Sequence, residues 1–337
     1  MRAIVLVGGF GTRLRPLTMT RPKQMLPVLD RPMIEWVIER LVDAGVEEVV
    51  LSLGYLPDAF RQAYPDQKCA GAALRYAVES SPLDTAGAIR FAAAEAGLGA
   101  DNEPFLVVNG DVIADLDLPA LLALHRDAGA EATIALTRVE DPSRYGVVPI
   151  DDAGRVEAFI EKPAPEAAPS HWINAGAYVL EPTVVDRIPP DRRVSIERET
   201  FPQLVAARSL FARQDDAYWI DAGTPATYLQ VQLDLLSRVS GMQANHVAAT
   251  AAVAPTATVA RSVVMDGAHV APQAFVAGSV LLPGAEVCKG ARVVSSIVGA
   301  GARIGTGADL DELCVVGDGV TVPDDLVLRA RRLPDED

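Results

Sequence analysis

The chain has 337 residues, half of them apolar and 22% charged, so it can bury a sizeable core in one large domain with an appendage or in two domains. Its formal net charge of −15 argues against a general nucleic-acid binder and against a protein that binds anionic membranes, because both need a basic face. A local basic pocket remains compatible with that charge.

Nothing in the sequence indicates a membrane or secreted protein. It contains no run of about 18 apolar residues, so we expect no membrane span. The apolar residues 3–7 are followed at once by Gly8-Gly9 and are too few for the core of a signal peptide. Three widely separated cysteines predict neither a disulfide framework nor a zinc site. We therefore expect a cytoplasmic protein.

Apolar strands alternate with amphipathic helices over the first part of the chain. The pattern predicts strands over 3–7, 49–53, 106–108 and 132–137 and helices over 33–44 and 118–128. This alternation is typical of a doubly wound, Rossmann-like α/β fold with a parallel or mixed sheet. Ligands of such folds bind beyond the carboxyl ends of the strands, where Gly8-Gly9 and Gly110-Asp111 would lie.

After about residue 245 an aliphatic residue recurs every six positions, apart from three intervals that are one residue short. Such a period predicts a parallel β-helix, in which short strands each place one aliphatic residue inward and the coils stack. A strand region merely rich in Ala and Val would not keep so long a series in phase. The aliphatic positions are Val247, Val253, Val259, Met265, Val270, Val276, Leu282, Val287, Val293, Val298, Ile304, Leu310, Val316 and Val322.

Residues 8–23, GGFGTRLRPLTMTRPK, form what we call the signature segment, which combines glycines with cations. Glycines directly after a strand let backbone N–H groups approach an anion closely. Prolines stiffen the segment, and clustered arginines on an acidic protein indicate a site for several phosphate charges, such as a triphosphate. The cations are Arg13, Arg15, Arg21 and Lys23.

Two familiar phosphate-binding loops fit this segment poorly. Leu14 stands where a dinucleotide-binding fingerprint has its third glycine, and the Gly-Lys-Ser/Thr of a Walker-type loop is absent. Taken alone, the segment is equally compatible with a glycine turn that carries solvated arginines.

Two aspartates each follow a short apolar run, Asp111 in the segment NGD and Asp221 in the segment YWIDAGTP. At such places a carboxylate can present oxygens to Mg²⁺, which usually takes one or two carboxylates together with substrate phosphates. The structural alternatives are an Asx-turn at Asp111 and a strand-to-helix junction at Asp221.

The run GGFGTRLRPLT, followed by Pro22-Lys23, resembles the signature of the sugar-1-phosphate nucleotidylyltransferases, or NDP-sugar pyrophosphorylases. The resemblance implies that the loop wraps the triphosphate, while Arg13 and Lys23 support the transferring α-phosphate and the pyrophosphate leaving group. It implies further contacts with the nucleotide from Gly8, Gly9, Gly11 and Thr12.

The two aspartates match the same family residue by residue. There, a Gly-Asp pair and a Trp-x-Asp-x-Gly segment supply the carboxylates that hold catalytic magnesium, which implies Asp111 and Asp221 as ligands of Mg²⁺ here.

Three segments resemble those that contact the sugar phosphate in this family. The resemblance assigns Lys162 to the phosphate of the incoming sugar 1-phosphate and Glu161 to the sugar hydroxyls. It assigns sugar contacts to Asn174 and to the backbone of Gly146. Because Lys162 precedes a proline, we also expect its backbone to be extended.

The segment LDTAGAI, residues 83–89, resembles the family's Leu-Gly-Thr-Ala-Gly-Ala segment, which lines the nucleotide. The resemblance implies nucleotide contacts from Thr85 and Gly87. Asp84 stands where the family usually has a glycine.

Within the family, the likeness is greatest to mannose-1-phosphate guanylyltransferases, through RLRPLT, SIERETFP and the hexapeptides, although KQMLPV leans toward glucose-1-phosphate thymidylyltransferases. The resemblance implies a nucleotidyltransferase domain over 1–240, a left-handed β-helix over 246–325, and synthesis of GDP-mannose and pyrophosphate from GTP and mannose 1-phosphate. The alternatives are a thymidylyl- or uridylyltransferase acting on glucose 1-phosphate, and a catalytically silent regulatory paralogue. Exposed ends of the β-helix also favour a homo-oligomer.

Overall fold

The computed structural model describes residues 1–190, 192–241 and 244–334, and its contacts divide the chain into two compact units. Unit 1 comprises residues 1–9 and 34–219. Unit 2 comprises residues 10–33 and the residues from 220 onward. The signature segment therefore leaves unit 1 after Gly9 and continues within unit 2. The domain limits expected from the sequence, 1–240 and 246–325, stay predictions.

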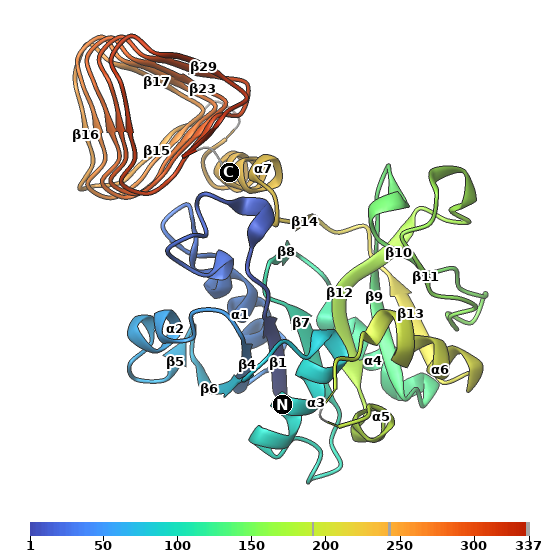
Figure 1. Ribbon diagram of the computed structural model, residues 1–337. Coiled ribbons are helices and arrows are strands. Elements are labelled where there is room, and N and C mark those ends of the chain that lie inside the picture. Colours follow the sequence, from blue (N-terminus) through green and yellow to red (C-terminus); the bar gives the residue numbers. More distant parts are fainter. Residues whose placement is uncertain (191, 242–243, 335–337) are drawn as a thin grey trace. The chain divides into compact units, whose positions relative to one another are not determined.

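The described residues of unit 1 form a ten-stranded mixed sheet (Figure 1), with the order β11-β10-β12-β7-β1-β4-β6-β5, while β9 pairs with β12 and β13 pairs with β9. Strands β7, β1, β4 and β6 are parallel, whereas β12 runs antiparallel to β7. The strands are β1 (Arg2–Val7), β4 (Glu48–Leu53), β5 (Lys68–Cys69), β6 (Ala72–Val78), β7 (Phe105–Asn109), β9 (Ala132–Arg138), β10 (Gly146–Val147), β11 (Ile160–Glu161), β12 (Trp172–Leu180) and β13 (Leu210–Gln214), with β8 (Val112–Ala114) outside this sheet.

Helices pack on this sheet and complete the α/β fold that the sequence predicts. Ile89 and Ala92 of α3 join Ile4 of β1, Val50 of β4 and Val107 of β7 in one buried apolar cluster. The helices of unit 1 are α1 (Met33–Asp43), α2 (Asp58–Ala63), α3 (Asp84–Ala96), α4 (Leu118–Ala128), α5 (Pro182–Arg187) and α6 (Phe201–Ala206). Among the described residues, no helix is long and apolar enough to cross a bilayer.

Unit 2 contains three parallel sheets that form the faces of a triangular coil (Figure 1), consistent with the predicted left-handed β-helix. It also contains α7 (Pro225–Ser240) and the hairpin of β2 (Pro27–Val28) and β3 (Arg31–Pro32), while β14 (Trp219–Asp221) spans the boundary between the units. The first sheet is β15 (His246–Val247), β18 (Val263–Val264), β21 (Val280–Leu281), β24 (Ile297–Val298), β27 (Val315–Val316) and β30 (Arg332–Leu333). The second is β16 (Ala252–Val253), β19 (His269–Val270), β22 (Glu286–Val287), β25 (Arg303–Ile304) and β28 (Thr321–Val322). The third is β17 (Thr258–Ala260), β20 (Phe275–Ala277), β23 (Arg292–Val294), β26 (Asp309–Asp311) and β29 (Val327–Arg329).

A ladder of buried serines marks the repeat of this coil. The hydroxyl of Ser262 accepts a hydrogen bond from the backbone N–H of Ser279, 17 residues later, and Ser279 does the same for Ser296. In the last step, Ser296 accepts from the N–H of Cys314, 18 residues later. The ladder satisfies polar groups at one corner of each coil and explains the short intervals in the sixfold period, because a coil of 17 residues has two steps of six and one of five.

Two positions in the predicted inward series are wrong. Val264 and Leu281 belong to the buried interior of the coil, whereas the expected Met265 and Leu282 do not. Met265 and Leu282 are nevertheless 3% and 0% exposed. The first sheet is therefore apolar on both of its faces, and α7 packs against β18. A period of six alone does not separate two adjacent aliphatic residues when both are buried.

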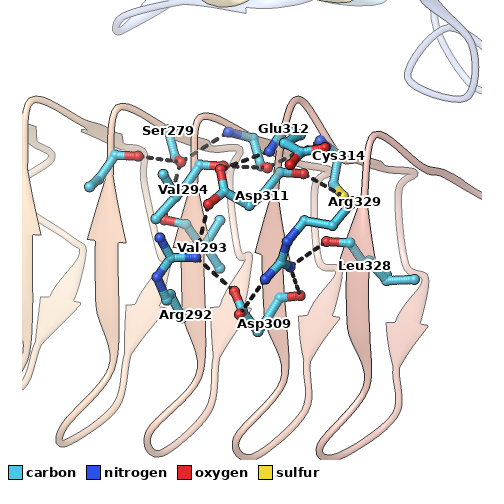
Figure 2. Close-up of polar contacts among 12 residues, drawn as sticks. Ser279, Arg292, Val293, Val294, Asp309, Asp311, Glu312, Cys314, Leu328 and Arg329 are labelled. Atoms are coloured by element: carbon cyan, nitrogen blue, oxygen red, sulfur yellow. Dashed lines mark hydrogen bonds and ion pairs between the residues drawn. The ribbon is translucent and has the colours of Figure 1, made fainter.

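Charged side chains cross three coils on the third sheet (Figure 2). Arg292 of β23 donates to Asp309 at 2.9 Å and to Asp311 at 3.0 Å, both in β26. Arg329 of β29 donates to Asp309 at 2.6 Å. Burial raises the pKa of the Asp309 carboxyl, but its pairing with Arg329 and Arg292 holds that pKa below the usual value. The pKa of the Asp311 carboxyl is lowered by the hydrogen bond from the N–H of Glu312 and by Arg292, against the opposing effect of burial. Equivalent residues of successive coils stack directly above one another in this sheet. The ion pairs stabilise the charged residues there because opposite charges face each other.

His125 of α4 is a structural residue of unit 1. It is 1% exposed, and its Nδ1 lies 2.9 Å from the hydroxyl of Thr133, while Nε2 lies 3.2 Å from a carboxylate oxygen of Glu181. Burial lowers the pKa of His125 below its usual value, and neighbouring Arg126 lowers it further, against the opposing effect of Glu181. The neutral imidazole is therefore the form that the fold prefers.

This preference predicts a loss of stability in mild acid. Because the folded-state pKa of His125 lies below the unfolded value of about 6.5, its contribution is complete above that pH and is lost as the pH falls through the folded-state pKa. We expect the unfolding temperature to fall between pH 7 and pH 5 by less in His125→Gln than in the wild type. The variant His171→Gln, at an exposed histidine, should match the wild type. Equal acid sensitivity of all three proteins would contradict this assignment.

Candidate functional site

In unit 1, two of the predicted residues follow neighbouring parallel strands. Leu6 of β1 is in register with Asn109 of β7, and the N–H of Gly110 donates to the carbonyl of Leu6 at 2.9 Å. Gly8 follows β1 and Asp111 follows Gly110, so both lie beyond the same carboxyl edge of the sheet, where the sequence analysis expects them. This edge can present one carboxylate and the glycine backbone to the same ligand.

The predicted sugar-phosphate residues come together on three adjoining strands of unit 1. Gly146 of β10 is in register with Glu161 of β11, and β10 pairs on its other side with β12, which carries Asn174. The Nζ of Lys162 lies 3.2 Å from Oε1 of Glu161. The Lys162 side chain is 59% exposed, so the ammonium group can exchange this partner for an anion from solvent.

The backbone of Lys162 differs from expectation. Its φ of +49° lies in the left-handed region, so the predicted extended conformation is wrong. The N–H of Lys162 donates to the carbonyl of Tyr145 at 3.0 Å, which continues the contact between β10 and β11 beyond Glu161. A non-glycine residue in this region stores strain, and such strain is common at functional sites.

Asn174 sits at a bulge in β12. The register of β12 with β9 shifts between Asn174 and Tyr178, and the two side chains are joined by a 2.8 Å hydrogen bond from the amide nitrogen to the phenol oxygen. Oδ1 of Asn174 accepts from the N–H of Gly176 at 2.9 Å. Burial raises the pKa of Tyr178 far above its usual value, so its hydroxyl stays protonated. These contacts fix the orientation of the Asn174 amide while leaving hydrogen-bonding capacity for a ligand.

Thr85 and Gly87, the predicted nucleotide contacts, bond to a second segment of unit 1. The hydroxyl of Thr85 donates to Glu197 at 2.8 Å and accepts from the N–H of Ile196 at 2.8 Å. The N–H of Gly87 donates to the carbonyl of Val194 at 3.2 Å. The structure therefore gives both residues a role in joining the start of α3 to residues 194–197.

Asp84, the departure from the family pattern, begins α3 with a φ of +63°. Glycine adopts this left-handed conformation freely, and aspartate is among the few other residues that tolerate it. Oδ1 of Asp84 also accepts from the N–H of Thr85 at 2.9 Å. Asp84 thus meets the same backbone requirement that a glycine would meet.

In unit 2, the signature segment folds back on itself. Gly11 has a φ of +61°, and its carbonyl accepts from the hydroxyl of Thr18 at 2.8 Å. A Cβ on Gly11 would lie 3.3 Å from the Cβ of Lys23. The short 3₁₀ turn Thr12–Leu14, which carries Arg13, and the similar turn Lys23–Met25 therefore start close to each other.

Arg13 lies beside Asp221 within unit 2. Nη2 of Arg13 is 3.7 Å from Oδ2 of Asp221, and Oδ1 of Asp221 accepts from the N–H of Gly223 at 2.8 Å. A Cβ on Gly223 would lie 2.6 Å from Nη2 of Arg13 and 2.7 Å from Oδ1 of Asp221. A larger residue at position 223 would therefore displace these two side chains. The Arg13 side chain is 62% exposed and can reach a bound anion.

Two residues near Lys23 have contacts or burial that the sequence does not predict. Arg21, grouped there with the phosphate-binding cations, pairs instead with Asp318 of the β-helix, 2.7 Å away. Gln24 is 1% exposed, and neither polar atom of its amide has a hydrogen-bond partner within the part of the chain that the structure describes. An unsatisfied buried amide is costly, so Gln24 is a further candidate for ligand contact. No local pattern marks it, because its burial depends on the folded segment.

The described residues contain no group of three or more His, Cys, Asp or Glu side chains that could hold a metal ion. A magnesium ion bound by one or two carboxylates together with substrate phosphates does not require such a group.

Comparisons with known proteins agree on the kind of protein this chain resembles. Residues 2–238 match the model of the family described as nucleotidyl transferase, and residues 242–334 match that of the GMPPB C-terminal domain. The mannose-1-phosphate guanylyltransferase of Mycobacterium tuberculosis is 42% identical over 240 residues, and mannose-1-phosphate guanylyltransferase 1 of Arabidopsis thaliana is 40% identical over 267 residues. A crystal structure of HddC from Yersinia pseudotuberculosis superposes with a TM-score of 0.60 at 28% identity.

These similarities differ in coverage. The match covers 71% of this chain and 65% of the M. tuberculosis protein, and 77% of this chain and 73% of the A. thaliana protein. The HddC match covers 69% of this chain and 99% of that chain. A second HddC structure, which matches with a TM-score of 0.59, is described as a complex with GMP-PN.

The left-handed backbone of Asp84 predicts how substitutions there affect stability. Asp84→Gly should change the free energy of unfolding by less than about 1 kcal/mol, whereas Asp84→Val should lower it by about 1–2 kcal/mol because a branched Cβ clashes in this conformation. Urea unfolding measures both. Glu95→Val, at an exposed position of the same helix, is the matched control. A loss in Asp84→Val no greater than that in the control would disprove the argument.

Proposed function

The chain belongs to the nucleotidyl transferase family, and from this membership we propose that it transfers a nucleotidyl group from a nucleoside triphosphate to a sugar 1-phosphate. We propose GTP and mannose 1-phosphate as the substrates and GDP-mannose and pyrophosphate as the products. The observation that carries the choice of substrates is that relatives about 40% identical from a bacterium and a plant share the name mannose-1-phosphate guanylyltransferase. The nucleotide analogue named in the second HddC structure supports the choice of a guanine nucleotide.

The reaction needs positioning and neutralisation of charge more than acid–base chemistry. An oxygen of the sugar phosphate attacks the α-phosphorus in line, the bond from that phosphorus to the bridging oxygen breaks, and pyrophosphate leaves with the electron pair. Arg13 and Lys23 would stabilise the charge on the α-phosphate and the leaving group. Their closeness within the folded signature segment supports this role. The backbone N–H groups of Gly8, Gly9, Gly11 and Thr12 would hold the triphosphate, and Thr85 and Gly87 would line the nucleotide.

On the sugar side, Lys162 would hold the phosphate of the nucleophile, and Glu161 and Asn174 would bind sugar hydroxyls beside the backbone of Gly146. The pairing of these strands supports a shared site for them. Lys162 gives up its contact with Glu161 as the sugar phosphate enters, so both charges find new partners in the complex.

Proteins of this family generally use a divalent metal ion, and we propose magnesium, with Asp111 and Asp221 as its protein ligands. The donor set fits, because carboxylates are the ligands that Mg²⁺ prefers. When bound, the ion supplies charge neutralisation for the phosphates. In unit 2, the N–H of Gly223 fixes the orientation of the Asp221 carboxylate. Removal of divalent ions should therefore abolish transfer.

The proposal also covers the domain limits, the location and the oligomeric state of the protein. We propose a nucleotidyltransferase domain over 1–240 followed by a β-helix over 246–325, and a cytoplasmic location. We also propose a homo-oligomer, which is supported by exposed apolar residues in the first and last coils, Val247 and Val327.

A matrix of substrates tests the function. Each of five nucleoside triphosphates is mixed with mannose, glucose or N-acetylglucosamine 1-phosphate, with and without Mg²⁺, and pyrophosphate release is measured. We expect the highest kcat/KM for GTP with mannose 1-phosphate. A preference for dTTP or UTP with glucose 1-phosphate would replace the proposed substrates, and the absence of release from every pair would favour a silent regulatory paralogue.

Loss of the Lys23 ammonium group should impair transfer strongly. We expect Lys23→Ala to lower kcat/KM by an amount equivalent to about 2–4 kcal/mol, by analogy with the loss of one donor to a developing anion. Lys289→Ala, at an exposed lysine of the β-helix, is the control and should leave kcat/KM unchanged. Turnover by Lys23→Ala close to that of the control would remove Lys23 from the proposed machinery.

A further inference from the structure

A single carboxylate of the β-helix holds the signature segment in unit 2. Oδ2 of Asp318, in the turn after β27, accepts hydrogen bonds from the hydroxyl of Thr20 at 2.8 Å and from Nη2 of Arg21 at 2.7 Å. Oδ1 of the same side chain accepts from the N–H of Ala300 at 2.8 Å, one coil earlier. The Asp318 side chain is 13% exposed, and its bonds to Arg21 and Ala300 are partly buried, whereas its bond to Thr20 is exposed.

The anchor lies next to the turn that carries Lys23. Arg21 is followed by Pro22, whose ring fixes its φ, and Pro22 leads directly into the turn Lys23–Met25. Fixing Arg21 therefore fixes the start of the turn. The turn is closed by hydrogen bonds from the N–H groups of Met25 and Leu26 to the carbonyls of Pro22 and Lys23.

The same anchor reaches Arg13 through the other end of the segment. Thr18, two residues before Thr20, bonds to the carbonyl of Gly11, and Gly11 precedes the turn that carries Arg13. Both proposed phosphate-binding cations are thus connected to the Asp318 carboxylate by short, hydrogen-bonded stretches of chain.

The end of the β-helix also supports the segment sterically. A Cβ on Gly317 would lie 3.0 Å from the Cβ of Pro16, so the coil meets the segment closely beside Asp318. In addition, Nη1 of Arg332 donates to the carbonyl of Arg15 at 3.2 Å.

We propose that Asp318 is a positioning residue for nucleotidyl transfer. It neutralises Arg21 and fixes the signature segment on the β-helix, so that Arg13 and Lys23 are held ready for the triphosphate. The inference rests on the proposed function for its kinetic consequence, while the effect on the segment itself does not depend on it. Arg21 accordingly acts as an anchor and not as a ligand of phosphate.

The variant Asp318→Asn isolates this anchor. If the amide oxygen keeps the bond from the N–H of Ala300, the NH₂ group replaces Oδ2 and faces the donors of Thr20 and Arg21. The anchor is lost while the bond inside the coil remains.

Asp324→Asn is the matched control. Oδ1 of Asp324 accepts from the N–H of Thr306 at 2.7 Å at the next corner of the coil, in the same way that Asp318 bonds Ala300. The Asp324 side chain is exposed. The control therefore makes the same chemical change at an equivalent bond of the coil and should leave the signature segment as it is.

Hydrogen exchange and steady-state kinetics give two separate measurements on the full chain. In Asp318→Asn we expect faster exchange at the N–H groups of Leu14 and Leu17, which are hydrogen-bonded within the signature segment, and at those of Met25 and Leu26, which bond back to its last two residues. We also expect kcat/KM for the triphosphate to fall by about tenfold to a hundredfold, as misplaced catalytic groups commonly cause. Asp324→Asn should change neither. Unchanged exchange and kinetics in Asp318→Asn would overturn the proposal.

Asp318→Asn could also act by disturbing the coil itself. Arg21→Gln removes the same ion pair but leaves the bond between Asp318 and Ala300 in place, so it separates the two causes. It should reproduce both effects, and the double variant should be no worse than the poorer single variant, since both changes remove one interaction. Additive losses would overturn the anchor role and assign Arg21 to the phosphates. If the wild type catalyses no transfer, faster exchange in both variants supports the anchor while the proposed function fails.

Discussion

Four cations within eleven residues of the signature segment repel one another, and the fold of unit 2 depends on how this repulsion is relieved. Arg13 lies beside Asp221 and Arg21 pairs with Asp318, so carboxylates from two distant parts of the chain meet the segment. Residues 10–33 consequently form one compact unit with the chain from 220 onward. The two pairs differ in exposure. Arg13 is 62% exposed and open to a ligand, whereas Arg21 is 29% exposed and committed to its partner.

The β-helix can hold other parts of unit 2 because its first sheet carries apolar residues on the outer surface as well as on the inner one. The outer aliphatic residues of the first sheet are buried, and α7 packs against β18. At its start, α7 is capped by Thr224, three residues after Asp221. Further along the helix, Gln232 bonds to the carbonyl of Pro27 and to the N–H of Leu29. Helix α7 thus joins the coil to Asp221 and to the hairpin that follows the signature segment.

Local patterns were sufficient for much of this structure. Alternating strands and helices predicted β1, β4, β7, β9, α1 and α4 to within one or two residues, and the sixfold period predicted the stacked coils. The structure places Glu161 and Lys162 beside Gly146, and Arg13 beside Asp221, while the roles of these residues stay predictions. The strands, helices and coils could be predicted because their periods act over a few neighbouring residues.

The features that failed depend on contacts between distant residues. Lys162 precedes a proline, which favours extended backbone, yet its hydrogen bond to Tyr145 accompanies a left-handed conformation. The comparison of Asp318 with Asp324 gives a second example of a contact that the local sequence does not predict. Both stand at corners of the coil and both bond an N–H one coil earlier, so their local sequence and chemistry give the same prediction. Only Asp318 meets the signature segment, because the segment reaches the coil beside Gly317. Which of two similar carboxylates bears on catalysis is thus decided by where the coil is covered, and that is a property of the assembled unit.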